Sequence, residues 1–187
     1  MTATRIDRAA RVRRALLELV AEHGLAGAGM SAVARRAGVA TGTAYVHYDS
    51  KEELLLAVYR EVKRDLGEAA RSAAESPAAP AARFSRIWKC VYRHLAADPA
   101  KARFLVQLDH SPLATQAHAS APDGEKDPLV AAATAPDIAS LLADLPLEVL
   151  FDLGLGPAIR LAAGGSRPSE TELDRVATAC WRAITRP

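Results

Sequence analysis

Apolar residues recur at the spacing of an α-helix along most of the chain, and no segment shows the alternation of a half-buried strand. The first such stripe consists of Val12, Ala15, Leu16, Leu19 and Val20, at positions i, i+3, i+4, i+7 and i+8. Alanine, the best helix former, makes up about a fifth of the 187 residues, whereas runs rich in valine, isoleucine and threonine are missing. The sequence therefore predicts an all-α protein.

Glycines divide the first part of the chain into three helices. The first helix is expected to end at Gly24, since glycine is the usual C-terminal stop. A short stripe over residues 30–37 predicts a second helix that Gly38 ends, and a third begins near Thr41. Two short helices joined by a glycine-containing turn, with an amphipathic helix before them, are the outline of a helix-turn-helix.

A long helix is expected to follow directly. Ser50 and Glu53 form a capping box, in which a serine at the N-cap is paired with a glutamate three residues later. The helix that they open continues to about Ala74, and the two prolines in residues 75–82 end it. That proline-containing stretch is the first candidate domain boundary.

The rest of the chain continues in helices. Helical patterns cover residues 84–108, while residues 120–128 are polar and rich in turn formers, which predicts a mobile segment. Residues 147–162 are apolar on almost every side, so this helix needs cover on more than one face, and Pro157 should kink it. The final helix carries its stripe over residues 173–184.

Charge is distributed unevenly. Residues 1–51 hold eight Lys/Arg against four acidic residues, a net charge of +4, and the remainder holds sixteen against eighteen, a net charge of −2. A basic end on a nearly neutral body favours a polyanionic partner for that end. Arg5, Arg8 and Arg11 could reach along a DNA minor groove as an arm, or form a solvated tail.

Several classes of protein find no support. The N-terminal arginines are not followed by an apolar block, and the longest apolar runs are too short to span a bilayer, which predicts a cytoplasmic protein without a membrane partner. No catalytic cluster and no phosphate-binding loop occurs at motif spacing, so we expect no enzyme and no cofactor. Cys90 and Cys180 are expected to be reduced, and Cys90 with His94 is a weak candidate metal pair.

The predicted third helix carries the side chains that a helix in the DNA major groove needs. Its outer face must present small or hydrogen-bonding residues. Gly42 and Thr43 allow close approach, and Tyr45 and His47 can reach phosphates. Lys51, in the first turn of the next helix, adds its charge to backbone N–H groups that already favour anions. Packing of Tyr45 in the core, and plain surface roles for His47 and Lys51, are the alternatives.

The stretch SAVARRAGVATGTAYVHYDSKEELLLAV resembles the signature of the tetracycline-repressor (TetR-like) family of bacterial transcription regulators. The match covers about residues 8–62. The resemblance implies a DNA-binding three-helix domain joined by a long helix to a helical ligand-binding and dimerisation domain. It assigns DNA contact to Thr41, Gly42, Thr43, Tyr45, His47 and Lys51. It assigns the core of the small domain to Val33, Ala34, Val39, Ala44 and Tyr48.

Three positions depart from the family pattern. Gly29 stands where a capping Ser or Thr is usual, which removes one phosphate contact. Thr41 stands where Lys is frequent, and Ala44 replaces a larger aliphatic residue. These departures keep open a rival interpretation, in which the chain is an all-α protein that binds a small molecule or a partner and no longer binds specific DNA.

The C-terminal half resembles the family's ligand-binding and dimerisation half through LGLGPAIRLAAGG and ATACWRAI. In such proteins the last two long helices form a four-helix bundle with a second subunit, and Gly154 would let those helices approach closely. The alternative is a monomer in which other helices of the same chain cover residues 147–162. A pocket for a small-molecule effector would lie among the helices after the linker. Its candidate residues, each of which could also be ordinary core, are Trp88, Val91, Tyr92, Phe104, Gln107, Leu108, His110 and Phe151.

The sequence as a whole thus predicts a homodimeric, ligand-responsive transcription regulator. We expect a repressor that binds a palindromic operator in double-stranded DNA and is released by a small molecule. The expected domains are residues 1–50 for DNA binding, 51–76 as the connecting helix, and 77–187 for ligand binding and dimerisation.

Overall fold

The computed structural model describes residues 2–120 and 128–186, and within these it contains twelve α-helices and no strand, which confirms the all-α prediction. The turn-rich segment predicted at 120–128 lies almost entirely outside the described residues. The chain divides into two compact units, residues 1–63 with 103–121 and residues 64–102 with 122–187. These limits cut through two helices, α4 (Lys51–Ala74) and α6 (Pro99–Asp109), so the functional boundaries at residues 50 and 76 remain predictions.

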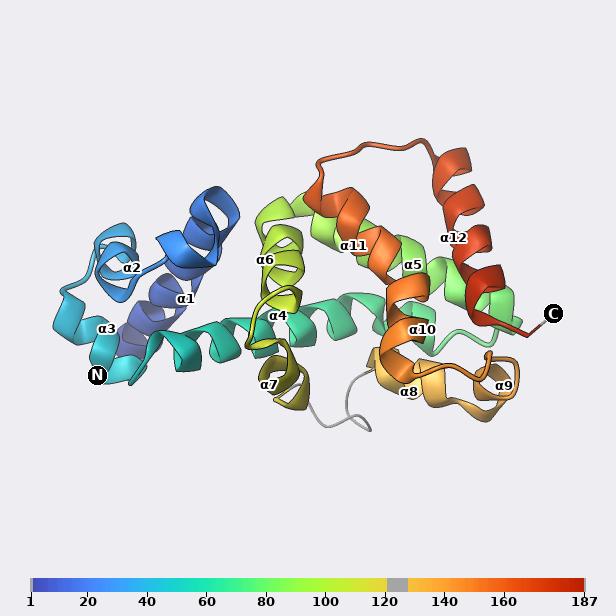
Figure 1. The fold of residues 1–187 in the computed structure, drawn as a ribbon, viewed down its shortest axis with the longest axis horizontal. Coiled ribbons are helices and arrows are strands. Elements are labelled where there is room, and N and C mark those ends of the chain that lie inside the picture. Colours follow the sequence, from blue (N-terminus) through green and yellow to red (C-terminus); the bar gives the residue numbers. More distant parts are fainter. Residues whose placement is uncertain (1, 121–127, 187) are drawn as a thin grey trace. The chain divides into compact units, whose positions relative to one another are not determined.

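The first unit begins with the three predicted helices α1 (Thr2–Gly27), α2 (Met30–Ala37) and α3 (Thr41–His47) (Figure 1). It also contains α7 (Ala114–Ala119) and the adjoining parts of α4 and α6. Gly24 interrupts α1 with φ 72° and ψ 175°, a conformation essentially restricted to glycine. Gly38 ends α2 in the left-handed region, at φ 65° and ψ 38°. The predicted stop at Gly38 is therefore confirmed, whereas Gly24 interrupts α1, which continues to Gly27.

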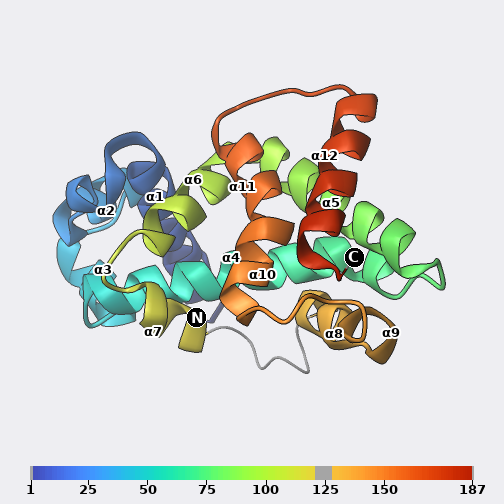
Figure 2. The same cartoon turned by 45° about the vertical axis from the view of Figure 1, so that its right-hand side comes forward.

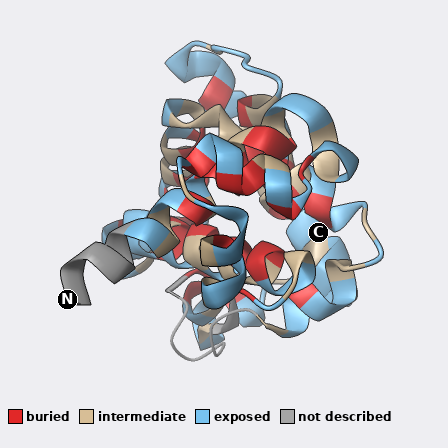
Figure 3. Ribbon diagram, turned by 90° about the vertical axis from the view of Figure 1, so that its left-hand side faces the viewer, coloured by how far each residue is buried: buried red, intermediate tan, exposed pale blue. Residues whose placement is uncertain are grey.

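The core of the first unit is built from the predicted helical stripes. Val12, Leu16 and Val20 of α1, Val33 of α2 and Leu54 of α4 have no exposed surface. Buried and exposed stretches alternate along each of these helices (Figure 3), as expected for helices with one apolar face. Of the predicted small-domain core, Val33, Ala34, Ala44 and Tyr48 are buried, and Val39 is half-buried.

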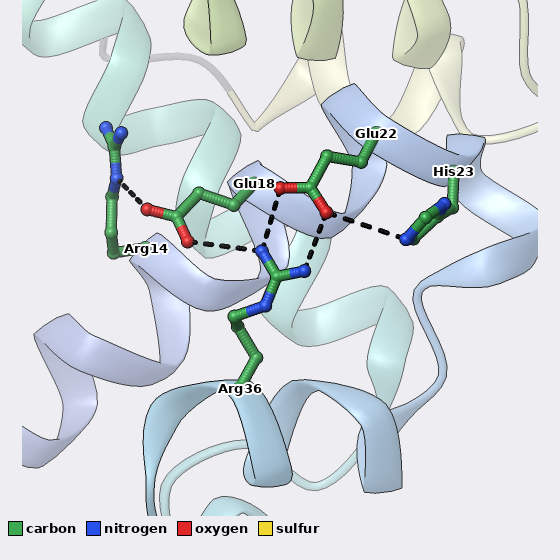
Figure 4. Close-up of polar contacts among 5 residues, drawn as sticks. All are labelled: Arg14, Glu18, Glu22, His23 and Arg36. Atoms are coloured by element: carbon green, nitrogen blue, oxygen red, sulfur yellow. Dashed lines mark hydrogen bonds and ion pairs between the residues drawn. The ribbon is translucent and has the colours of Figure 1, made fainter.

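A ladder of charged side chains joins α1 to α2 on the surface (Figure 4). Arg36 of α2 donates to both carboxylate oxygens of Glu22, at 2.9 and 2.6 Å, and to Glu18 at 3.4 Å. Arg14 donates to the other oxygen of Glu18 at 2.8 Å, and His23 Nε2 lies 3.5 Å from Glu22. The hydrogen bond from Arg36 lowers the pKa of Glu22, so this carboxylate stays ionised over a wider pH range.

The long helix α4 begins at the predicted cap, with one difference in detail. Ser50 Oγ accepts a hydrogen bond from the Glu53 N–H at 3.0 Å, as a capping box requires. The Glu53 carboxylate reaches one residue further back than expected and accepts from the Asp49 N–H at 2.6 Å. Two N–H groups at the junction of α3 and α4 are therefore satisfied by side chains.

The second unit packs the C-terminal helices around α5 (Pro80–Ala97) (Figures 1 and 2). Besides parts of α4 and α6, its other helices are α8 (Pro128–Thr134), α9 (Pro136–Ala139), α10 (Leu147–Gly154), α11 (Gly156–Ala163) and α12 (Glu170–Ile184). Both α11 and α12 contact α5, and α10 contacts α12. Trp88 lies at the centre of this unit, fully buried, and its indole N–H donates to the Gly154 carbonyl at 3.1 Å.

The helix predicted over residues 147–162 is two helices, because the chain breaks at Leu155. The interruption lies just before Pro157, which has no N–H to donate to the preceding turn. Leu155 keeps a right-handed helical backbone, with φ −94° and ψ −22°, so the predicted disturbance near Pro157 is a one-residue interruption between two helices.

Gly154 makes its close contacts within one chain, where the sequence had placed it between two subunits. A Cβ atom on Gly154 would lie 3.5 Å from the Cδ1 and Cγ2 atoms of Ile184 and 3.8 Å from Phe84. Leu173, Cys180 and Ile184, the buried stripe of α12, likewise face the inside of this unit.

None of the helices in the described part of the chain combines the length and apolarity that a bilayer crossing requires.

Candidate nucleic-acid interface

The short helix α3 has one buried and one exposed side. Ala44 has no exposed surface, and Tyr48, one turn later, is also buried. Thr41, Gly42 and Tyr45 are exposed, with 48% of Tyr45 accessible. The other two predicted contact residues on this helix, Thr43 and His47, are half-buried at the edge of the exposed side. A helix with small and hydroxyl-bearing residues outside can approach the base edges of a major groove.

Val46 is a member of the exposed face that the sequence did not suggest. It is 69% accessible, the largest value among the large exposed apolar side chains in the described part of the chain. Val46 follows Gly42 by four residues and Thr43 by three, so all three share a side of the helix. That spacing could have indicated exposure of Val46, but an apolar residue so close to Ala44 suggests a side chain that packs in the core. An exposed aliphatic side chain here suits contact with a thymine methyl group.

The residue that follows α3, Tyr48, is held by a side chain of α1 that is itself paired with α4. Arg13 of α1 donates to the Tyr48 hydroxyl at 2.8 Å and also pairs with Glu61 of α4. Burial alone would lower the pKa of Arg13, but its hydrogen bonds to Tyr48 and Glu61 raise that pKa above its ordinary value. The arginine therefore stays charged while it fixes the tyrosine that follows α3.

Lys51 is not simply extended into solvent. It is the first residue of α4, and its ammonium group donates a hydrogen bond to the Leu25 carbonyl near the end of α1. Its side chain is half-buried as a consequence. The proposed phosphate-binding lysine thus has a partner within the protein.

The N-terminal arginines belong to a helix. Arg5, Arg8 and Arg11 all fall in α1, which is helical from Thr2 onward. Arg8 and Arg11 are exposed. An extended minor-groove arm would have to form from residues that are helical in this structure.

The eight candidate effector-binding residues fall into both units. Trp88, Val91, Tyr92 and Phe151 belong to the second, and the other four, Phe104, Gln107, Leu108 and His110, to the first. Trp88 and Tyr92 stack with ring centroids 6.2 Å apart, and the Tyr92 hydroxyl donates to the Ser166 carbonyl at 2.6 Å. The Trp88 indole N–H and the Tyr92 hydroxyl therefore both have hydrogen-bond partners within the second unit. Phe151 is 38% accessible on the outer side of α10.

Two of the predicted effector residues, Gln107 and His110, line an open hollow of about 600 Å³ in the first unit. Residues 23–26 at the end of α1 form one side of it, and residues 106, 107 and 110–112 form the other. Phe104 and Leu108, on the same helix as Gln107, are buried in the core and absent from this lining. The hollow places the end of α6 directly beside the interruption of α1 at Gly24.

The cysteines and His94 do not assemble a metal site among the described residues. Cys90 is half-buried and Cys180 is buried, and both are free thiols. No group of three metal-ligating side chains occurs in the part of the chain that the structure describes. His94 has a buried Nε2 atom without a hydrogen-bond partner. Burial, with Lys101 nearby, lowers its pKa below the ordinary value of 6.5, although Asp65 and Asp98 oppose the shift.

We expect the second unit to lose stability as the pH falls through the ordinary histidine pKa of 6.5. Because the folded-state pKa of His94 is lowered, the unfolded chain binds more protons in this range, and acid favours unfolding. Denaturant titrations between about pH 8 and pH 5 would measure the effect, and His94→Leu should flatten the curve. A dependence on pH that His94→Leu leaves unchanged would contradict this assignment.

Comparison with known families matches both halves of the chain. Residues 12–58, which contain α2 and α3, match the family described as "Bacterial regulatory proteins, tetR family". Residues 80–185 match the family described as "Tetracyclin repressor-like, C-terminal domain". Each half therefore matches the corresponding domain of the same family, in the expected order. No curated protein sequence matches the chain significantly.

Solved structures with the same fold include regulators from several bacteria. A TetR family transcription regulator from Marinobacter aquaeolei VT8 is 20% identical, with full coverage of both chains and a TM-score of 0.80. The TetR-family transcriptional regulator HI0893 from Haemophilus influenzae RD is 26% identical, also with full coverage of both chains, and has a TM-score of 0.76. These matches confirm the predicted fold, and with the two family matches they show that the chain belongs to the TetR family of bacterial transcription regulators.

Proposed function

We propose that the protein is a repressor that binds a palindromic DNA operator as a homodimer and is released by a small-molecule effector. Its site of action would be the cytoplasm, where the chromosome is accessible. The exposed face of α3 carries this proposal. Four neighbouring features define how α3 is presented. They are the interruption of α1, the glycine that ends α2, the buried side of α3, and the capped start of α4.

The proposed DNA-contacting set keeps the predicted residues and adds one. Thr41, Gly42, Tyr45 and Val46 would meet the groove, and Thr43 and His47 would reach phosphates at its edge. Lys51 would contribute charge next to the N-terminus of α4. Because Ala44 and Tyr48 fill the inner side, substitutions on the outer side should change DNA affinity without unfolding the helix.

A homodimer is supported by apolar surface on α10 and the segment before it. Leu147 is 63% accessible, and Phe151, one turn later, and Leu153 are also exposed. Leu141 and Leu145, in the segment before α10, are exposed as well. Exposed apolar side chains gathered in one part of the chain are typical of protein–protein interfaces. An equivalent surface on a two-fold-related copy would cover it, and would hold two α3 helices for two half-sites.

The effector is proposed to bind in the C-terminal half, as the family resemblance implies, with Gln107 and His110 as the residues best able to orient it. Both line the hollow beside the end of α1, which supports a role in linking ligand binding to the DNA-binding helices. The similar structures include a protein described as the fatty acid degradation regulator FadR from Bacillus halodurans, 18% identical over 93% of this chain and 98% of that one, with a TM-score of 0.69. At that identity the likeness concerns the fold.

Selection of duplexes from a random-sequence DNA pool tests the proposal without knowledge of the operator. The parent protein should enrich sequences with two-fold symmetric half-sites about one helical turn apart or a multiple of it. Binding to an enriched duplex should weaken linearly with the logarithm of salt concentration. Failure to enrich any duplex would favour the rival function, an all-α binding protein without specific DNA recognition.

Tyr45→Ala should weaken binding to the enriched duplex by about tenfold or more, since a groove or phosphate contact contributes roughly 1–3 kcal/mol. Helix content and assembly should remain unchanged, because nearly half of this side chain is exposed. Fluorescence anisotropy with labelled duplex measures the affinity, and circular dichroism measures the helix content. Thr171→Ala, on the exposed first turn of α12, is the control and should bind like the parent.

A further inference from the structure

The ammonium group of Lys51 is held by a specific backbone oxygen of another helix. Lys51 is the first residue of α4, and Leu25, whose carbonyl accepts its hydrogen bond, lies 26 residues earlier in the chain. The two residues belong to the same compact unit. We infer that Leu25 is a positioning residue, whose carbonyl holds Lys51 in place for phosphate contact.

The Leu25 carbonyl is available because of Gly24. The last carbonyl groups of a helix lack partners within the helix, and a nearby lysine commonly satisfies one of them. Gly24, with φ 72° and ψ 175°, interrupts α1 one residue before Leu25. Among the backbone N–H groups of the described residues, only that of Ala28 also donates to this carbonyl, at a long 3.4 Å. The ammonium of Lys51 therefore meets an oxygen that the helix itself leaves largely unused.

This hydrogen bond leaves Lys51 able to bind an anion. An ammonium group has three N–H donors, and the Leu25 carbonyl uses one of them. A free lysine side chain loses much of its rotational freedom when it binds a phosphate, which weakens the contact. In this protein the side chain is ordered before DNA arrives. Pre-ordering of this kind raises affinity without adding a contact to the DNA.

The position of Leu25 depends on a conformation that only glycine readily adopts. Gly24→Ala places a Cβ on a backbone with φ 72°, and that Cβ would also lie 3.3 Å from Gln107 Oε1. The substitution should therefore move the Leu25 carbonyl while leaving every charge in place. Lys51→Met removes the ammonium and keeps an unbranched side chain. Because the inference rests on the proposed DNA-binding function, the two substitutions are best compared by their effects on DNA binding.

A double-mutant cycle with the duplex enriched by the parent protein measures the coupling between these positions. We expect Lys51→Met to weaken binding about tenfold in the parent background, and to reduce the salt dependence by about one unit of slope. In the Gly24→Ala background the same substitution should weaken binding only about two- to threefold, because the lysine there is no longer held. Ala26→Ser, which alters the neighbouring exposed residue without constraining the backbone, should leave the tenfold effect intact.

Nuclear magnetic resonance of the free parent protein supplies a second measurement that needs no variant. The ammonium hydrogens of Lys51 should exchange slowly enough to give a resolved signal at low temperature, unlike those of solvated lysines. Absence of that signal would overturn the inference, even if Gly24→Ala failed to fold. Equal effects of Lys51→Met in both backgrounds would overturn it as well, with the DNA-binding function intact. A parent protein that enriches no duplex would instead overturn the proposed function, and the positioning role with it.

Discussion

Gly154→Arg is expected to unfold the second unit. The Gly154 backbone is buried, and a Cβ there already meets Ile184 at 3.5 Å and Phe84 at 3.8 Å. The remaining atoms of an arginine have no space between α10, α12 and α5, and its charge would find no solvent. The hydrogen bond from Trp88 to the Gly154 carbonyl would be lost with the displaced helix. We expect a loss of roughly 4 kcal/mol or more in the free energy of unfolding.

Thermal and denaturant unfolding followed by circular dichroism would measure this loss. The matched control is Ala97→Arg, which puts the same side chain on an exposed residue at the end of α5, in the same unit. That variant should keep its helix content and its unfolding midpoint within a few degrees of the parent protein. A cooperatively folded Gly154→Arg variant of parental stability would show that the packing of α10 against Ile184 is wrong.

The double variant Leu147→Glu/Phe151→Glu should remain folded and become monomeric. These two side chains lie one turn apart on α10 and are 63% and 38% accessible, so their replacement opens no cavity in the core. Two copies of the variant would bring four new carboxylates together at the proposed interface. Operator affinity should fall at least about a hundredfold, since a single subunit contacts one half-site only.

Sedimentation at micromolar concentration measures the assembly, and anisotropy with the enriched duplex measures the affinity. Arg167→Glu, on an exposed loop residue, controls for the change of charge and should stay dimeric. A parent protein that sediments as a monomer at this concentration would contradict the homodimer and the mechanism that depends on two linked half-sites. A double variant that remains dimeric would place the interface elsewhere on the chain.

Features that depend on a few neighbouring residues were predictable from the sequence. Gly24 interrupts α1 and Gly38 ends α2 because their backbone conformations exclude most other residues. Ser50 opens α4 because its hydroxyl accepts from an N–H only three residues away. Burial of Ala44 and exposure of Tyr45 follow from the helical period alone. Each of these features depends on residues close together in the sequence, so each can be predicted without the tertiary structure.

Features that depend on distant partners were not predictable. The hydrogen bond from Lys51 to Leu25 uses a backbone oxygen, and every residue has one, so no side-chain pattern marks it. Phe151 looked like a pocket residue because aromatic side chains usually are buried, yet its accessible side depends on where α12 packs. Gly154 could have served a contact within or between subunits, since a small residue permits either.

The packing of α5 has a consequence for the synthesis of the chain on the ribosome. The partner of Trp88, Gly154, is synthesised 66 residues later, and the partner of Lys89, Asp174, is synthesised 85 residues later. At roughly 5–20 residues per second, the ribosome needs about 3 to 13 s to supply the first of these partners. During that interval the apolar side of α5, with Phe84, Trp88 and Leu95, has no final cover. During this period a chaperone, or a non-native segment of the chain, can bind that surface of the nascent protein. In contrast, α1, α2 and α3 can pack against one another as soon as they leave the ribosome.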